Sequence, residues 1–282
     1  MKQLTAIAFF FFCISLQAQS QVEEERPPLT RILFVFDGSQ SMYGRWESGA
    51  KIDVAQRLMG QMLDSLQGIQ EEGNFQLALR VYGHQKPVPP QDCSDTRLEV
   101  PFSNGNIYKI KRVLKAIKPK GTTPIAGSLL KASYDFPPCA DCRNIVILIT
   151  DGVEACDGDP CVVSKRLQQK GIILKPFVIG IGLDEDFKDS FECVGTYFDA
   201  ADENTFKNVL GVVISQALDN TTAQINLLDN RGKPTETNVP ILLYDHTSQK
   251  LRKSFVHTLN YKGQPDTMVL DPLVVYDMVV HT

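Results

Sequence analysis

The sequence predicts an α/β protein in which helices cover both faces of a mostly parallel sheet, followed by a small β-sandwich-like domain. Over residues 30–220, short apolar runs alternate with segments of helical periodicity, which is typical of parallel sheets with crossover helices. One apolar run is unbroken, as in a strand covered on both faces. After residue 221 the helical periodicity ends, and short strand-like runs follow one another between turn signals.

The first half of the α/β region supplies two strands and two helices. Residues 32–36 form a short continuous apolar run, which predicts the first strand. Residues 52–66 carry apolar side chains at helical spacing and predict a helix, and residues 75–82 predict the next strand. Residues 107–117 place four apolar side chains on one helical face.

The second half continues the alternation. We predict a helix over residues 125–134, just after Pro124, because proline is favoured at the start of a helix. The β-branched and leucine run 145–149 predicts a fully covered strand. A helix over 162–170 ends at a glycine and leads into a strand over 172–181. The set is completed by a helix at 186–193, a strand at 197–198 and a helix at 203–218.

The last part of the chain is predicted to be all β. Apolar runs separated by turn residues predict strands at 225–228, 241–244, 251–259, 268–270 and 274–280. We assign residues 30–220 to the α/β domain and residues 222–282 to the β-sandwich-like domain. Because the chain stops inside an apparent strand, we expect the natural protein to continue; a short protein with a frayed end is the alternative.

The composition excludes some classes of protein. With 282 residues, 43% apolar and 22% charged, the chain can bury a sizeable core in one large or two unequal domains. Its formal net charge of −4 offers no basic excess to neutralise phosphates, which argues against nucleic-acid binding.

Residues 1–18 have the pattern of a secretory signal peptide. Lys2 precedes an apolar stretch that is too short to span a bilayer as a helix, so we predict no transmembrane segment. Cleavage fits after either Ala18 or Ser20, and a buried N-terminal strand is the alternative interpretation. Residues 19–29 then form a solvated lead-in. The sequence therefore predicts export to the periplasm, the cell surface or the medium.

Export suggests disulfide bonds among the six cysteines outside this segment: Cys93, Cys139, Cys142, Cys156, Cys161 and Cys193. The sequence leaves their connectivity open. A short loop makes Cys156–Cys161 our first choice, the C-x-x-C unit suggests Cys139–Cys142, and the other two remain for each other. The C-x-x-C unit could also be redox-active or half of a zinc site. A structural disulfide is favoured because no second C-x-x-C or histidine pair accompanies it.

Oxygen-bearing side chains follow the ends of the predicted strands in three loops. The first strand leads into a D-x-S-x-S pattern made by Asp37, Ser39 and Ser41. Thr123 lies in a loop just before a helix, and Asp151 follows the strand at 145–149. Since ligands bind at the carboxyl ends of the strands in such sheets, we expect these five side chains to converge.

This donor set favours a hard divalent cation. Hard cations prefer oxygen ligands, so Mg²⁺ is the first expectation, with Mn²⁺ or Ca²⁺ as alternatives. Two aspartates supply countercharge, while three neutral hydroxyls leave the ion electrophilic, with a coordination position free for an outside carboxylate. The competing interpretation is that Asp37 and Ser39 are helix caps and Asp151 belongs to a turn.

The pattern resembles that of the von Willebrand factor A family, whose metal-ion-dependent adhesion site uses a D-x-S-x-S loop, a threonine and an aspartate. All five positions agree in type, order and approximate spacing, and the resemblance covers roughly residues 30–218. It implies that Ser39, Ser41 and Thr123 are direct metal ligands, while Asp37 and Asp151 act directly or through water.

Other stretches narrow the resemblance to exported bacterial members of the family. These are Tyr82-Gly83-His84, residues 92–95 and residues 151–156.

Two features depart from the family's site pattern. Thr122 stands next to Thr123, although the following proline favours Thr123. Glu154 lies close to the site, where it could act as an intramolecular ligand or repel an acidic partner.

The sequence therefore predicts an exported adhesion or protein-binding module that recognises an Asp or Glu of a protein partner through a divalent cation. It predicts no enzyme activity and leaves the oligomeric state open. The alternatives are a metal-dependent hydrolase, in which the ion activates water and Glu154 is the one evident base, and a structural assembly domain of a larger cell-envelope protein.

Overall fold

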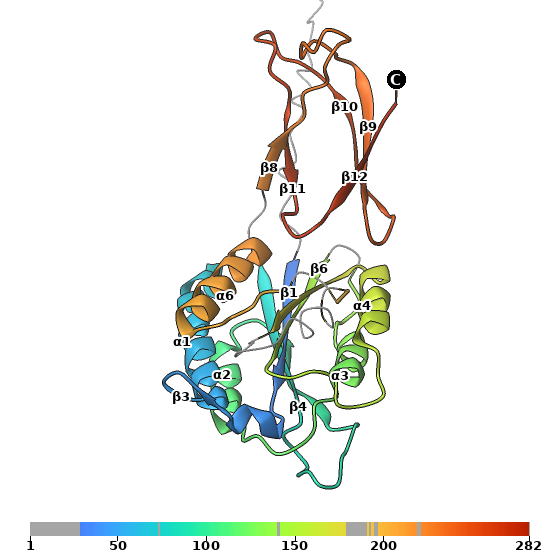
Figure 1. The fold of residues 1–282 in the computed structure, drawn as a ribbon. Helices are drawn as coiled ribbons and strands as arrows, with labels where there is room; N and C mark the ends of the chain where they lie inside the picture. The colour runs from blue at the N-terminus through green and yellow to red at the C-terminus, as the bar shows by residue number, and fades with distance from the viewer. Residues whose placement is uncertain are drawn as a thin grey trace, which may run out of the picture.

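The computed structural model describes residues 29–72, 74–139, 142–178, 191, 193–194, 197–218 and 221–281. Figure 1 shows a layered α/β unit, with helices on both sides of a central sheet, and a separate group of β-strands beyond one end of that sheet. This is the architecture that the sequence predicts: a mostly parallel α/β fold followed by a β domain.

The central sheet has five strands in the order β5-β4-β1-β6-β7. The strand β1 pairs in parallel with both β4 and β6, β6 pairs in parallel with β7, and β5 is antiparallel at the edge. The carboxyl ends of β1, β4, β6 and β7 therefore lie at the same end of the sheet, which we call its carboxyl edge. The bounds are β1 Leu29–Asp37, β4 Phe75–Tyr82, β5 Thr96–Ser103, β6 Cys142–Thr150 and β7 Ile172–Val178.

The two central strands are almost wholly buried because helices cover both of their faces. In β1 every residue from Thr30 to Asp37 is buried, and in β6 the same holds from Ile145 to Thr150. Side chains alternate between the faces, so Ile32 and Phe34 belong to one core and Leu33 to the other. This double burial explains why both strands read as unbroken apolar runs in the sequence.

Each face of the sheet carries its own helices (Figure 1). One core contains Leu58, Leu114 and Phe206 from three helices: α1 (Lys51–Glu72), α2 (Ile107–Ala116) and α6 (Glu203–Leu218). The other contains Leu129 and Leu167 from two helices: α3 (Ile125–Ala132) and α4 (Pro160–Gln169). The predicted helices are confirmed at these places, with ends that differ by a few residues.

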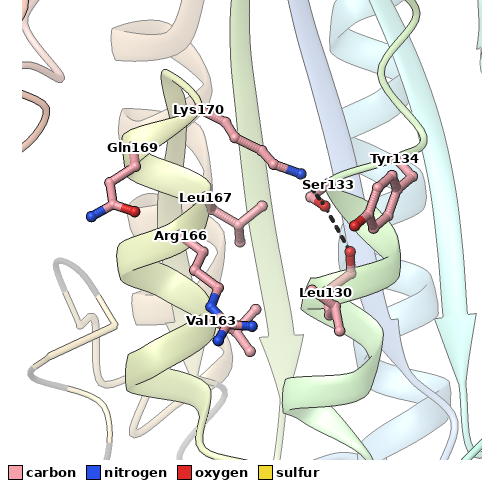
Figure 2. Close-up of a pocket in the computed structure, with 8 residues that line it drawn as sticks. All are labelled: Leu130, Ser133, Tyr134, Val163, Arg166, Leu167, Gln169 and Lys170. Atoms are coloured by element: carbon pink, nitrogen blue, oxygen red, sulfur yellow. Dashed lines mark hydrogen bonds between the residues drawn. The ribbon is translucent and has the colours of Figure 1, made fainter.

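A pocket of about 250 Å³ lies between α3 and α4 (Figure 2). Leu130 and Tyr134 come from the α3 side and Leu167 from α4, while the ammonium of Lys170 lies 4.4 Å from the centre of the Tyr134 ring. Lys170 also donates a hydrogen bond to Ser133, 3.2 Å away. Lys170, one of the two cationic side chains that line this pocket with Arg166, is therefore already engaged with its wall.

The C-terminal strands form two small antiparallel sheets, β10-β9-β12 and β11-β8. Ile241, Leu243 and Met268 are buried between them. We call residues 221–281 the β module. Its strands are β8 Thr221–Gln224, β9 Val239–Asp245, β10 Leu251–His257, β11 Thr267–Leu270 and β12 Tyr276–Val280.

Two of the predicted strands are wrong. Tyr197 and Phe198 adopt no regular secondary structure; their side chains pack against the two cores as part of a loop. Residues 225–228 are also not a strand: the ladder is formed by residues 221–224 just before them. Ile225 and Leu227 still pack against the core of the β module, so their apolar character reflects burial rather than strand pairing.

Other elements were not predicted. The edge strand β5 contains Pro101 and two charged residues, which interrupt the apolar pattern that would predict a strand. Proline is nevertheless tolerated at a sheet edge. A short 3-10 helix, η1 (Gln40–Tyr43), follows β1. After it, β2 (Arg45–Trp46) and β3 (Gly49–Ala50) pair as a small hairpin.

Some predictions lie outside the described residues. These are the signal peptide at 1–18, nearly all of the lead-in at 19–29, and most of the helix expected at 186–193. Within the described ranges, none of the helices is long and apolar enough to cross a bilayer. The domain boundaries stay a prediction.

Candidate metal centre

The first group of candidate ligands lies at the end of β1, on the carboxyl edge of the sheet. Asp37 is the last residue of β1, Ser39 lies just before η1, and Ser41 lies within η1. Gly38 is required between them, because a Cβ there would lie 2.9 Å from the carbonyl oxygen of Tyr82 and 2.8 Å from Cβ of His84. The turn therefore passes closely over the end of β4.

Backbone hydrogen bonds bring the second and third loops beside the first. Ser39 and Gly121 form a parallel bridge, and the N–H of Gln40 donates to the carbonyl of Gly121 at 2.9 Å. The N–H of Ala155 donates to the carbonyl of Thr123 at 3.0 Å, which joins the loop after β6 to the loop before α3. Three segments that are far apart in the sequence are thus fastened together by the main chain.

The two serines and Asp151 form a continuous chain of hydrogen bonds. The hydroxyl oxygens of Ser39 and Ser41 lie 2.9 Å apart, and Ser41 donates to Oδ1 of Asp151 at 2.7 Å. The hydroxyls of Thr123 and Ser41 both lie beside Gly152, since a Cβ on Gly152 would be 3.8 Å from each of Ser41 Oγ and Thr123 Oγ1. The structure therefore places Ser39, Ser41, Thr123 and Asp151 around one small region.

Asp37 lies behind this group and is fully buried. Its Oδ1 accepts the N–H of Ser39 at 2.7 Å. Its Oδ2 accepts hydroxyl protons from Tyr82 at 2.9 Å and Thr150 at 2.7 Å. Burial, together with the nearby charge of Asp151, raises the pKa of Asp37 to about 6. A cation at the site would oppose both effects, because positive charge favours the ionised carboxylate.

The choice between Thr122 and Thr123 has a geometric answer. The hydroxyl of Thr122 accepts a hydrogen bond of 3.5 Å from the side-chain amide of Gln91, which belongs to the loop between β4 and β5. Thr123 instead neighbours Gly152 and Ser41. Thr123 is therefore the residue that shares the region of the two serines.

Glu154 is engaged elsewhere. One of its carboxylate oxygens accepts the N–H of Ala126 in the first turn of α3, and the other accepts the N–H of Cys156 at 2.9 Å. Burial raises the pKa of this carboxyl, while these N–H bonds oppose the rise. Glu154 therefore works as a cap on α3, where negative charge is favoured.

One charged side chain at the site was missed by sequence reasoning. The ammonium of Lys51, the first residue of α1, lies 2.8 Å from Oδ2 of Asp151. The side chain of Asp151 is fully buried, and its second carboxylate oxygen already pairs with this ammonium. No pattern in the sequence indicated this contact, because it depends on the path of the unpredicted β2–β3 hairpin.

These residues fit a hard divalent cation. The donor set is three hydroxyls and two carboxylates, all oxygen, as Mg²⁺ and Ca²⁺ prefer. The residues that the structure describes contain no cluster of three or more His, Cys, Asp or Glu side chains suited to a metal ion, so any ion here depends on the hydroxyls. The Lys51 ammonium on Asp151 indicates in addition that the region attracts positive charge.

The cysteines form three disulfide bonds, with a connectivity that differs from our first choice, and one of them ties together two loops beside the site. The bonds are Cys93–Cys156, Cys139–Cys142 and Cys161–Cys193. The C-x-x-C pair forms as expected, but Cys156–Cys161 and Cys93–Cys193 are wrong. Cys156 faces the loop between β4 and β5, whose Gln91 also donates to the carbonyl of Ala155. Cys161 instead lies in the first turn of α4.

Comparison with known proteins identifies relatives in Bacillus subtilis. The Bacillus subtilis protein YwmD is 29% identical over 189 residues, covering 65% of this chain and 82% of YwmD. YwmC of the same organism is 28% identical over 225 residues, covering 76% of this chain and 94% of YwmC. Both relatives are described as uncharacterized.

Solved structures share the fold at low sequence identity. BatB from Bacteroides thetaiotaomicron is 19% identical with a TM-score of 0.53, covering 67% of this chain and 98% of BatB. Proximal thread matrix protein 1 of the mussel byssus, solved with a zinc-occupied MIDAS motif, is 18% identical with a TM-score of 0.53, covering 68% and 46%. The pilus adhesin SpaC from Lactobacillus rhamnosus GG is 14% identical with a TM-score of 0.58, covering 91% and 39%.

The family follows from the match along the chain itself. The model of the von Willebrand factor type A domain matches residues 32–210, which run from β1 into α6 and include all five candidate ligands. The sheet order, the helices on both faces and the loops at the carboxyl edge agree with that match. The chain therefore belongs to the von Willebrand factor type A domain family.

Proposed function

We propose that this protein is an exported, metal-dependent binding module that recognises a carboxylate of a protein partner. Ser39, Ser41 and Thr123 would hold a divalent cation directly, and Asp37 and Asp151 would balance its charge directly or through water. Mg²⁺ is the proposed ion, with Mn²⁺ or Ca²⁺ as alternatives. When bound, the ion would offer an open coordination position to an Asp or Glu side chain of the partner.

The observation that carries the proposal is the convergence of the three loops. The hydrogen-bonded chain from Ser39 through Ser41 to Asp151 brings the D-x-S-x-S turn and the loop after β6 within direct contact. Ser41 is exposed while Asp37 and Asp151 are buried, so charge is held inside and a neutral donor faces solvent. That arrangement favours binding of an outside anion over complete neutralisation of the ion within the protein.

Export is supported by the disulfide bonds, because disulfides persist in oxidising compartments. The apolar segment within residues 1–18 has the sequence pattern of a signal peptide. The periplasm, the cell surface and the medium all fit. The naming of one structural neighbour as a pilus adhesin and of another as a thread matrix protein is in keeping with a role in adhesion.

A hydrolytic function is less well supported. Glu154, the base that the sequence suggested, uses both carboxylate oxygens to accept backbone N–H groups at the start of α3 and at Cys156. Moving a proton through Glu154 would disturb the cap of that helix. A structural assembly role remains a second candidate, and the ion-binding test below separates it from metal-dependent recognition.

The test is calorimetric titration of the purified protein with MgCl₂ and MnCl₂. Ser41→Ala removes one proposed ligand from an exposed position, so the fold should persist. Ser65→Ala is the matched control, because Ser65 is an exposed serine on α1 that bonds only to the carbonyl of Met62 among the contacts described. We expect one ion to bind the wild type, at least about tenfold weaker binding to Ser41→Ala, and no change in Ser65→Ala. Equal affinity in all three proteins would refute the proposed ligand set.

Recognition of a partner is tested separately. The protein is immobilised and exposed to envelope extract from its source in Mg²⁺ or in EDTA. A protein that is retained in Mg²⁺ by the wild type and by Ser65→Ala, but lost in EDTA and with Ser41→Ala, is the expected result. Retention that is indifferent to EDTA would favour the structural assembly role.

A further inference from the structure

The ion pair between Lys51 and Asp151 differs from the other lysine pairs on the protein. The ammonium of Lys51 is 2.8 Å from Oδ2 of Asp151, and the two side chains are 14% and 0% exposed. By contrast, Lys86 in its pair with Asp92 is 62% exposed, and Asp64 in its pair with Lys111 is 57% exposed. Because water screens exposed pairs, the Lys51–Asp151 pair is the one in which charge acts most strongly.

The position of Lys51 is built into the fold. Its backbone N–H donates to the carbonyl of Gly44 at 2.8 Å, which fixes the start of α1 against the end of the D-x-S-x-S turn. A Cβ on Gly44 would lie 3.4 Å from Cε of Lys51, so the lysine stem runs along the open side of this glycine. The hairpin formed by β2 and β3 lies between these two residues and returns the chain to the site.

The ammonium neutralises one of the two buried carboxylates of the site without any ion. Asp151 receives the Ser41 hydroxyl on one oxygen and Lys51 on the other. Asp37 has hydroxyl and N–H donors but no cation among the contacts described. Of the two buried carboxylates, Asp151 is therefore the one neutralised by the protein itself.

We propose that Lys51 is a built-in cation of this site, which holds Asp151 in place without metal and lowers the affinity of the site for a divalent ion. This inference rests on the proposed function. A divalent ion on Ser41 and Asp151 would be close to the ammonium, and like charges repel. A partner carboxylate would offset that repulsion, so ion and partner should bind better together than either does alone.

The test replaces the charge while keeping the stem. Lys51→Met removes the ammonium, and Lys51→Gln keeps a hydrogen-bond donor without charge. Lys111→Met, the matched control, removes a half-buried lysine whose partner carboxylate is exposed. Two quantities are measured at pH 7.5: the midpoint of thermal unfolding in EDTA, and the dissociation constant for Mg²⁺ by calorimetry. The EDTA measurement needs no metal, so it tests the role of Lys51 even if the ion assignment fails.

We expect Lys51→Met to unfold at a lower temperature than the wild type in EDTA, because it leaves a buried carboxylate without its cation. We expect both Lys51 variants to bind Mg²⁺ about tenfold more tightly than the wild type, since the repulsion is removed. Lys111→Met should match the wild type in both measurements.

The outcomes separate the two proposals. If the wild type binds Mg²⁺ and Lys51→Met and Lys51→Gln bind it equally or more weakly, the inference about Lys51 is overturned while the metal site stands. If neither the wild type nor any Lys51 variant binds Mg²⁺ or Mn²⁺, the proposed function is overturned. If Lys51→Met does not fold, Lys51→Gln supplies the Mg²⁺ dissociation constant and the unfolding temperature in EDTA.

Discussion

Individual buried residues at this site support exposed ones. Asp37 is fully buried and holds the D-x-S-x-S turn through the N–H of Ser39, while Tyr82 and Thr150 hold Asp37. The sequence predicted Asp37, because an aspartate at the end of an apolar strand is visible as a pattern. It could not predict Tyr82 or Lys51, because their contacts depend on the register of neighbouring strands and on an unpredicted hairpin.

Arg80 and Asp135 make a second buried pair, away from the site. The guanidinium donates two hydrogen bonds of 2.7 Å to the carboxylate, and the side chains are only 7% and 9% exposed. Asp135→Ala should lower the free energy of unfolding by about 3–5 kcal/mol, because it leaves a buried guanidinium without its anion. Urea denaturation measures the change, with Asp64→Ala as an exposed control that should stay close to the wild type. A loss no greater than that of the control would contradict this account.

At the scale of elements, the parts that follow local patterns were predictable. The helix at 203–218 and the strand at 75–82 have the expected bounds because each shows its own periodicity. The strand β5 and the pairing of the four cysteines outside the C-x-x-C unit were not predictable. The strand β5 is an edge strand that contains Pro101, and cysteines that are close in sequence, such as Cys156 and Cys161, point to different elements.

The Cys93–Cys156 bond ties the loop between β4 and β5 to the loop that follows Asp151. It spans 63 residues, so the chain-entropy model assigns it a stabilisation of about 4 kcal/mol. Replacing both cysteines with serine should therefore lower the free energy of unfolding by about that amount in urea. It should also weaken Mg²⁺ binding, since the loop carrying Asp151 loses its tether.

The matched control for that change is replacement of the Cys139–Cys142 pair by serine. That bond closes a separation of only 3 residues, so a much smaller loss is expected. Equal losses of stability in the two double variants would mean that loop length does not govern the stabilisation by these disulfide bonds.

At the scale of the whole molecule, contacts of Asp271 and Leu273 join the β module to the α/β unit. Arg143, near the start of β6, donates to the carbonyls of Ala217 at 2.7 Å and Gln216 at 3.0 Å at the end of α6. The same guanidinium pairs with Asp271 of the β module. Leu273, which follows Asp271, is buried in the core that α1, α2 and α6 share with the sheet.

This junction predicts that the two parts unfold together. The double variant Asp271→Ala/Leu273→Ala should split a single calorimetric transition into two, because it removes both the ion pair and the buried anchor. Val269→Ala, an exposed change on β11, is the control and should keep one transition. One transition at the wild-type temperature in the double variant would mean that the junction does not couple the parts.

The central claim is that three loops of one von Willebrand factor type A domain hold a single divalent ion through Ser39, Ser41 and Thr123. The most direct measurement is a crystal structure of the protein grown with MnCl₂, with anomalous diffraction data that locate manganese. We predict one strong anomalous peak within about 2.0–2.6 Å of those hydroxyl oxygens or of waters held by Asp37 and Asp151. A structure with manganese bound elsewhere, and none at this site, would contradict the claim.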